Sequence, residues 1–201
     1  MKSEYTTEEK IYEAAKKVFL TKGLDGARMQ EIADIAGINK ALLHYYFRTK
    51  EKLYSEVVKN SASTFFPQIM TILLSELPFE VKIWTIVDKY INFLQQNPYV
   101  PHFILTSLNN NTDAVLDIFH KQNIINIDEL QNQIDKEAEK GLIKKVDARQ
   151  LLFNFIGMCV FPFIAKPIIK NILSVESEQY DELIEERKKI IPLVLMAWLK
   201  A

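Results

Sequence analysis

Apolar side chains recur every three or four residues along almost the whole chain, which is the spacing of helices that bury one face. The first such stripe consists of Ile11, Ala14, Ala15, Val18 and Phe19. The sequence has no alternating Val-, Ile- or Thr-rich segments joined by a hairpin turn. The pattern therefore predicts an all-α protein, with about nine helices by this periodicity.

Three of the predicted helices are short and lie within the first 52 residues. Thr6 and Glu9 have the spacing of a capping box, in which each side chain binds a backbone N–H of the other residue. A second helix is expected at about residues 29–36 and a third at about residues 40–47. These helices form a small head, which we assign to residues 1–52.

The second and third helices have the layout of a helix-turn-helix. Gly37 permits the positive φ of a sharp turn, and Asn39 can cap the helix that follows. Leu43 and Phe47 are four residues apart, so they share one face and are expected to pack inward. The remaining face of the third helix is left for another role.

Residues 53–201 are predicted to form a larger C-terminal helical domain. Gly and Pro number only five and seven in the chain, so long flexible linkers are not expected. The helices expected in this domain cover residues 53–75, 79–96, 101–108, 113–140, 147–173 and 176–200.

Composition excludes several function classes. The single Cys159 rules out a disulfide framework within one chain, and no Cys/His cluster has metal-ligand spacing. No nucleophile elbow, zinc-protease pair, phosphate-binding loop or dinucleotide fingerprint is present. We therefore expect no enzymatic activity, no cofactor and no metal.

The chain also shows no membrane signal. Its N-terminus is polar and charged, and the longest uncharged apolar run, between Arg149 and Lys166, is shorter than the roughly 20 residues of a membrane span. We expect a cytoplasmic protein with no membrane partner.

Charge is unevenly distributed. The net charge is −1, but residues 1–54 hold ten Lys or Arg against eight Asp or Glu, and residues 55–201 hold 15 against 18. A mildly basic head on an acidic body is compatible with a nucleic-acid partner, although a difference of this size is common.

The outward face of the third helix has an unusual composition for a solvated face. It carries Lys40, His44 and Tyr45, together with Ala41, whose small side chain permits close approach. Such a mixture suits a helix in the major groove of DNA, where cations and hydrogen-bonding side chains reach bases or phosphates. Lys50, in the first turn of the next helix, can pair with a phosphate.

At these residues the sequence resembles the TetR family of transcriptional regulators. The resemblance covers roughly residues 7–53 and rests on Ala15, Phe19, Glu31-Ile32-Ala33, Ala36-Gly37-Ile38, Lys40, Tyr45-Tyr46-Phe47, Lys50 and Leu53. It implies a homodimer that binds a palindromic DNA operator through two recognition helices. It also implies a repressor whose C-terminal domain binds an unknown small-molecule effector that lowers its affinity for DNA.

The resemblance also indicates which residues face DNA. The candidates are Arg28, Asn39, Lys40, Ala41, His44, Tyr45, Tyr46 and Lys50. Arg28 stands where many members have Ser or Thr, so it is either a phosphate partner or a solvated side chain. Leu42 is either a contact to a thymine methyl group or a partly buried flank.

The C-terminal domain is rich in aromatic residues, most of which helical spacing assigns to the core. The family resemblance points to a cavity among the middle helices. Its candidate lining is Phe65, Trp84, Phe103, Phe119, Phe155 and Cys159, with His102, Asn109, His120 and Asn154 as polar points. An apolar or aromatic effector would suit this composition.

The last two predicted helices are apolar over more than one stripe, which suggests a dimer surface. The residues concerned are Leu151, Leu152, Phe155, Ile156, Cys159, Val160 and Phe163 on one helix, and Ile184, Ile191, Leu195 and Trp198 on the other. The resemblance implies that they pair with their symmetry mates in a four-helix bundle. The alternative is a pair of helices buried within one chain.

One further function remains open from the sequence alone. The mild charge of the head is compatible with a helical ligand-binding or adaptor module that does not bind DNA.

Overall fold

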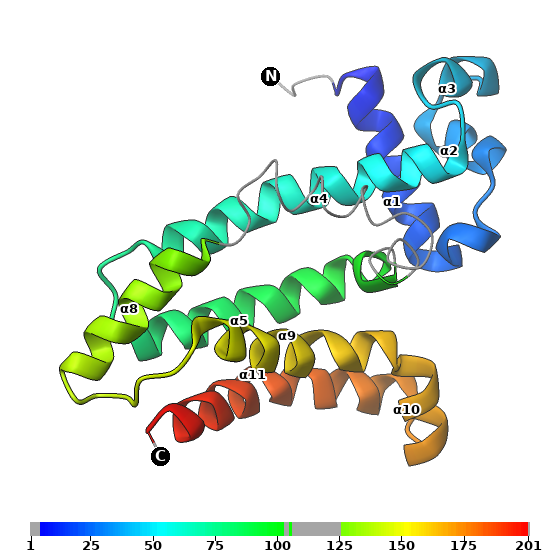
Figure 1. Ribbon diagram of the computed structural model, residues 1–201. Helices are drawn as coiled ribbons and strands as arrows, with labels where there is room; N and C mark the ends of the chain where they lie inside the picture. The colour runs from blue at the N-terminus through cyan, green and yellow to red at the C-terminus, as the bar shows by residue number, and fades with distance from the viewer. Residues whose placement is uncertain (1–4, 103–104, 106–125, 201) are drawn as a thin grey trace. The chain divides into compact units, whose positions relative to one another are not determined.

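The computed structural model describes residues 5–102, 105 and 126–200 (Figure 1). All regular elements in these residues are helical, which confirms the predicted all-α class. The principal helices are α1 (Thr7–Gly26), α2 (Met29–Ala36), α3 (Lys40–Tyr46), α4 (Lys50–Leu73), α5 (Phe79–Gln96), α8 (Ile127–Glu139), α9 (Ala148–Ile164), α10 (Lys166–Leu173) and α11 (Ser177–Lys200).

The chain folds as two compact units. The first contains residues 1–64 and 97–118, and the second contains residues 65–96 and 119–201. The division between them falls inside α4, so this helix contributes its first half to one unit and its last turns to the other.

The first unit begins at the predicted capping box. The Thr6 side chain accepts a hydrogen bond from the Glu9 N–H at 3.2 Å, and the Thr6 N–H donates to Glu9 Oε2 at 2.7 Å. Gly23 has φ 63° and ψ −174°, so regular helical geometry is interrupted there, as expected for a residue with no Cβ. The remaining residues to Gly26 follow as a short extension.

A compact core holds the helices of the first unit together. Ile11, Phe19 and Leu43 are completely or almost completely buried, and Tyr54 from α4 joins them. The rings of Phe19 and Tyr54 meet edge to face with centroids 4.7 Å apart. This geometry is favourable for aromatic pairs, so it fixes α4 against α1.

In the second unit, α5, α9 and α11 lie side by side (Figure 1). Ile91 of α5 and Ile191 of α11 are fully buried, and so are Leu199 of α11 and Ile134 of α8. The apolar faces that the sequence predicts for these helices therefore meet in one core.

The predicted helix at residues 147–173 is divided in two. Helix α9 ends at Ile164, α10 begins at Lys166, and the two axes differ by 72°. Pro167 has no N–H for the carbonyl four residues earlier, and its ring clashes with that carbonyl, so the α9 helix ends before it. The expectation of one continuous helix was wrong, and the proline was its missed signal.

The predicted helix at residues 113–140 is also not continuous. Asn126 has non-helical backbone angles (φ −88°, ψ 88°), and its side chain accepts a hydrogen bond from the Glu129 N–H at 3.0 Å. Asn126 therefore caps α8, which begins at Ile127. An Asn followed three residues later by Glu is a typical start of a helix. The helical spacing of the sequence continues through Asn126, so the prediction missed this start.

In the part of the chain that the structure describes, no single helix is long and apolar enough to cross a membrane. The bent pair α9 and α10 meets the length and composition test only when both are taken together. The same described residues contain no group of three or more His, Cys, Asp or Glu side chains placed to hold a metal ion.

Candidate nucleic-acid interface and helical cavity

The turn between α2 and α3 is built by two residues with different roles. Gly37 has φ 70° and ψ 31°, and its N–H bonds to the carbonyls of Ala33 and Asp34 at the end of α2. Asn39 accepts a hydrogen bond from the Leu42 N–H at 2.7 Å and so caps α3. The sharp turn and the immediate restart hold α3 at a fixed angle to α2.

The inner face of α3 is buried as the sequence predicts. Leu43 is 0% exposed and Phe47, at the end of the helix, is 4% exposed. Phe47 also packs against the ring of Tyr12 in α1, with centroids 5.8 Å apart. Because this side of α3 is anchored, the opposite side is held outward.

The opposite side of α3 brings together Lys40, Ala41, His44 and Tyr45, all of them exposed. Tyr45 is 81% exposed, which is unusual for so large a ring. A hydrogen bond of 3.3 Å between His44 Nδ1 and the Arg48 carbonyl orients the imidazole across the end of the helix. This reading face, defined as these four residues, offers a cation, two hydrogen-bonding rings and a small side chain.

Tyr46 and Leu42 flank the reading face. Tyr46 is 38% exposed and stacks on Phe47, with centroids 6.4 Å apart, while it meets Tyr45 edge to face. Leu42 is 36% exposed. Both side chains therefore combine a packed part with a free edge.

The two outlying cations differ in their surroundings. Arg28 is exposed at the N-terminal end of α2, where it makes no side-chain capping bond. Lys50 donates a hydrogen bond of 3.3 Å to the Asp25 carbonyl and is half-buried. The positions of both near helix N-termini favour anions, because free N–H groups and the helix dipole point outward there.

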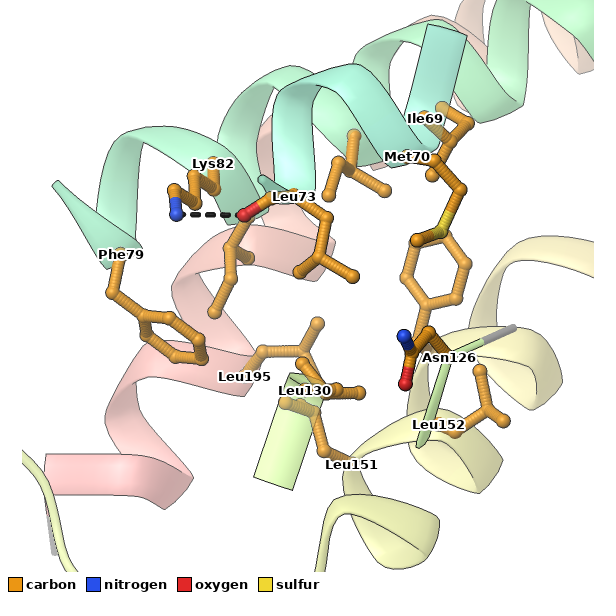
Figure 2. Close-up of a pocket in the computed structure, with 13 residues that line it drawn as sticks. Ile69, Met70, Leu73, Phe79, Lys82, Asn126, Leu130, Leu151, Leu152 and Leu195 are labelled. Atoms are coloured by element: carbon orange, nitrogen blue, oxygen red, sulfur yellow. Dashed lines mark hydrogen bonds between the residues drawn. The ribbon is translucent and has the colours of Figure 1, made fainter. Parts of the chain in front are cut away.

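A separate site is a cavity of about 120 Å³ inside the second unit (Figure 2). Eleven apolar and two polar residues line it, and they come from α4, α5, α8, α9 and α11. They are Ile69, Met70, Leu73, Phe79, Lys82, Ile83, Ile86, Asn126, Leu130, Leu151, Leu152, Phe155 and Leu195. The cavity is therefore suited to an apolar occupant.

Lys82 is buried at one end of this cavity. Its Nζ donates to the Leu73 carbonyl at 2.8 Å (the dashed line in Figure 2) and to Gln133 Oε1 at 2.9 Å. Desolvation by burial lowers its pKa, and the nearby carboxylates of Glu76 and Glu129 oppose that change. The Leu73 carbonyl also accepts from Gln133 Nε2 at 2.7 Å, so Lys82 and Gln133 together cap the end of α4.

Asn126 is the second polar residue of the cavity, and its two amide atoms have different surroundings. Its oxygen is engaged in capping α8, as described above. Figure 2 shows the amide group facing the open space of the cavity, in the neighbourhood of Leu130 and Leu152. The NH2 group is thus placed to donate to a molecule in the cavity.

Comparison with known proteins identifies the head. Residues 11–57 match the family described as bacterial regulatory proteins, tetR family. This segment contains α2, α3 and the whole reading face. The head of this chain, residues 11–57, is therefore a domain of the TetR family.

Several proteins similar to this chain have been characterised or solved. The transcriptional repressor NicS of Pseudomonas putida is 37% identical over 59 residues, which make up 29% of this chain and 28% of NicS. The match therefore spans less than a third of that relative. FadR of Bacillus subtilis, solved with stearoyl-CoA, has a TM-score of 0.67 at 17% identity and covers 94% of this chain and 98% of its own.

A second solved structure contains both DNA and a small molecule. AibR, in complex with isovaleryl coenzyme A and operator DNA, has a TM-score of 0.60 at 22% identity. It covers 79% of this chain and 86% of its own. At this identity the two solved structures establish the fold of this chain alone.

Among the predicted cavity residues in the described part of the chain, Phe155 lines the cavity and the others do not. Phe155 lines the cavity, whereas Phe65 is stacked on Phe93 with centroids 4.1 Å apart and is absent from the lining. Trp84 is half-buried and Cys159 is buried, and neither lines the cavity. Phe103 and Phe119 lie outside the described residues.

Of the predicted polar points, none belongs to the described lining of the cavity. His102 and Asn154 are exposed, and Asn109 and His120 lie outside the described residues. Sequence reasoning missed Lys82 and Asn126. The capping pattern that begins at Asn126 was a local signal. No pattern in the sequence indicates that Lys82 of α5 is buried, because lysines on helices are usually exposed.

The chain has many exposed apolar side chains on α9 and α11. More than a third of the surface is exposed in eight of these side chains: Phe153, Ile156, Phe161, Ile164, Leu183, Ile190, Leu193 and Val194. Other members of the predicted set, among them Ile184, Ile191 and Leu195, are buried within the chain. The two helices thus combine an internal face with an uncovered apolar face.

Proposed function

We propose that this chain is a cytoplasmic transcriptional repressor of the TetR family without catalytic activity. It binds a palindromic DNA operator as a homodimer and is released when a small molecule binds the C-terminal domain. Residues 1–52 contact DNA, and residues 53–201 bind the effector and form the dimer.

The observation that carries this proposal is the reading face of α3. Its four residues are exposed while Leu43, on the opposite side, is completely buried. Such a helix, presented on a rigid head, is the element that helix-turn-helix proteins insert in the major groove. In that position Lys40 reaches a base edge or a phosphate, and Tyr45, which is 81% exposed, is free to contact the duplex.

The neighbouring residues position the helix on the DNA backbone. Tyr46 and Lys50 contact phosphates, and Asn39 lies where the first turn of α3 approaches the duplex. Arg28 adds a charge contact in place of a hydroxyl at the start of α2. These contacts contribute affinity and register, whereas the reading face contributes sequence preference.

The uncovered apolar face of α9 and α11 supports the homodimer. An apolar surface of this kind on two neighbouring helices is typical of an interface between subunits. In such a homodimer the two recognition helices would have to lie about 34–36 Å apart to meet successive major grooves on one side of DNA.

Named relatives support the remaining parts of the proposal. NicS is a transcriptional repressor, and AibR was solved with both operator DNA and a coenzyme A thioester. FadR was solved with an acyl-CoA. By analogy, the helical cavity of this chain is the effector site.

The test is binding of the purified chain to palindromic fragments from the region upstream of its own gene. We expect a shift whose affinity falls steeply with salt, since each phosphate contact releases counterions. Lys40→Ala and Tyr45→Ala should each weaken binding about tenfold or more, as expected for lost groove contacts. Lys145→Ala and Tyr5→Ala, which change exposed side chains outside the reading face, serve as matched controls.

Two results would contradict the proposal. Unchanged affinity in both reading-face variants would refute the assignment of α3. Absence of salt-dependent binding to any upstream fragment would instead favour a helical ligand-binding or adaptor module.

A further inference from the structure

The size of the helical cavity limits its occupant. Its volume of about 120 Å³ is somewhat below the roughly 150 Å³ of an engineered apolar cavity that binds benzene. The walls are apolar side chains of five helices, among them Phe79, Leu130 and Leu195. The cavity is partly open, and a single ring or a short branched chain fills its enclosed part.

The polar groups of the cavity limit the charge of its occupant. Lys82 is the cation of the described lining, and its ammonium is already bound to the Leu73 carbonyl and to Gln133. The charges of Glu76, Glu129 and Glu137 act on this ammonium more strongly than that of the cation Lys136, so the local balance disfavours a further anion. An anionic ligand would therefore have to break the cap of α4 or leave its charge unpaired in an apolar site, and both are costly.

Asn126 limits the polar functional group of the occupant. Its oxygen is held by the Glu129 N–H, so the group it presents to the cavity is the NH2 donor. A ligand with one hydrogen-bond acceptor satisfies this donor. A ligand that brings only donors does not.

We propose that the effector is a small uncharged molecule with an apolar body of about one ring and one carbonyl-type acceptor, which accepts a hydrogen bond from Asn126 Nδ2. Ketones, esters and amides of this size belong to the class. The inference rests on the proposed function, because it names the ligand of the same effector site. It separates this chain from FadR and AibR, whose coenzyme A ligands carry several phosphates.

Three probes with the same ring separate the possibilities: toluene, acetophenone and benzoate. Titration calorimetry of the full chain should give the tightest binding for acetophenone, about fivefold tighter than toluene, as expected for one added hydrogen bond. Benzoate should bind at least about tenfold more weakly than acetophenone, because its charge has no partner. Tighter binding of benzoate than of acetophenone would overturn the proposal.

The variant Asn126→Asp tests the donor. Aspartate keeps the oxygen that caps α8 but presents no donor when ionised. Acetophenone should lose its advantage, so that its affinity relative to toluene falls to about one. The matched control Asn171→Ser, at an exposed residue of α10, should keep the fivefold ratio.

The variant Leu130→Phe tests the location. The added volume fills the cavity, so toluene and acetophenone should both lose at least about tenfold in affinity. Unchanged binding in this variant would place the probes elsewhere and refute the inference.

An operator-binding experiment distinguishes the failure of this inference from the failure of the proposed function. If the chain binds its operator and none of the three probes binds, the proposed ligand class is wrong but the proposed function as a DNA-binding regulator stands. If acetophenone binds as expected and no operator fragment is shifted, the proposed ligand class stands but the proposed function fails.

Discussion

The phenol hydroxyl of Tyr54 donates a 2.8 Å hydrogen bond to the main-chain carbonyl oxygen of Tyr99, 45 residues further along the chain. Both residues are buried. The hydroxyl of Tyr99 in turn donates to Asn97 Oδ1 at 2.8 Å and lies 3.0 Å from Ser61 Oγ. Burial raises the pKa of Tyr54 and of Tyr99, so both phenols stay protonated and the network acts through neutral hydrogen bonds.

Removal of the Tyr54 hydroxyl should therefore destabilise the first unit. Tyr54→Phe keeps the ring and its contact with Phe19 but leaves the Tyr99 carbonyl without this donor. We expect a loss of about 1–3 kcal/mol in the free energy of unfolding. Urea denaturation followed by circular dichroism measures it, with Tyr5→Phe at an exposed site as the control. Equal stability of both variants would show that the buried hydrogen bond contributes nothing net.

The two faces of α3 should respond oppositely to substitution. Leu43→Ala removes a completely buried side chain and should cost about 2–5 kcal/mol of stability. Ala41→Ser, on the exposed face, should leave the unfolding midpoint unchanged while it alters operator affinity. Thermal unfolding and DNA binding measured on the same samples separate the two effects. A large loss of stability in Ala41→Ser would contradict the exposed position of the reading face.

Two glycines form a matched pair for testing the turn. Gly37 has φ +70°, and a Cβ built on it meets no atom within 4 Å, so Gly37→Ala should cost about 1 kcal/mol from backbone strain alone. Gly157 lies in α9, and a Cβ there also meets no atom within 4 Å. Gly157→Ala should instead stabilise the chain by about 0.5–1 kcal/mol, because alanine favours the helix.

Chemical denaturation of both glycine variants measures the contrast. Changes of opposite sign in the free energy of unfolding would confirm that backbone conformation decides the effect, because a Cβ meets no atom within 4 Å at either site. Changes of the same sign would contradict this explanation.

Local signals in the sequence predicted the head in detail. The caps at Thr6 and Asn39 and the positive φ of Gly37 each depend on residues within four positions, and the structure contains all three. Thr49 likewise caps α4 through a 3.1 Å bond from the Lys52 N–H. The family pattern covers the same segment, so local and family information agree there.

The cavity could not be predicted in the same way. Helical periodicity says that Phe65 is buried, but its partner Phe93 comes from another helix, and only packing decides which rings meet. Lys82 is buried because the end of α4 lies beside it, a relationship between distant residues that no local pattern records. The missed break before Pro167 and the missed cap at Asn126 had local signals, which the continuous apolar periodicity outweighed.

The uncovered apolar face of α9 and α11 leads to a prediction about assembly. Leu193 of α11 is 59% exposed, so Leu193→Glu should not disturb the fold of one chain but would place a charge in the proposed interface. We expect the variant to be monomeric by light scattering where the unmodified chain is dimeric. Leu77→Glu, at another exposed leucine outside these helices, should remain dimeric. A dimeric Leu193→Glu would move the interface elsewhere.

Cys159 lies in α9 on the internal side and is buried. Burial raises the pKa of its thiol from the ordinary 9.0 to about 12. Thiolate is the reactive form, and its fraction at pH 8 is lower by three powers of ten for a pKa of about 12 than for 9.0, so the native chain should react with a disulfide reagent on the order of 1,000-fold more slowly than an exposed thiol. The variant Cys159→Ala/Asn171→Cys provides that exposed thiol on α10.

The same shift predicts a dependence of stability on pH. Between about pH 9 and 12 the unfolded thiol loses its proton while the native thiol keeps it, so this group favours unfolding increasingly as pH rises. The stability of the unmodified chain relative to Cys159→Ala should therefore fall by roughly 1 kcal/mol between pH 9 and pH 10 and stay constant below pH 8. Denaturation of both proteins at each pH measures the difference, in which the titration of all shared groups cancels. A difference that does not change with pH would mean that the native thiol ionises as readily as the unfolded one, and that α9 leaves it open to water.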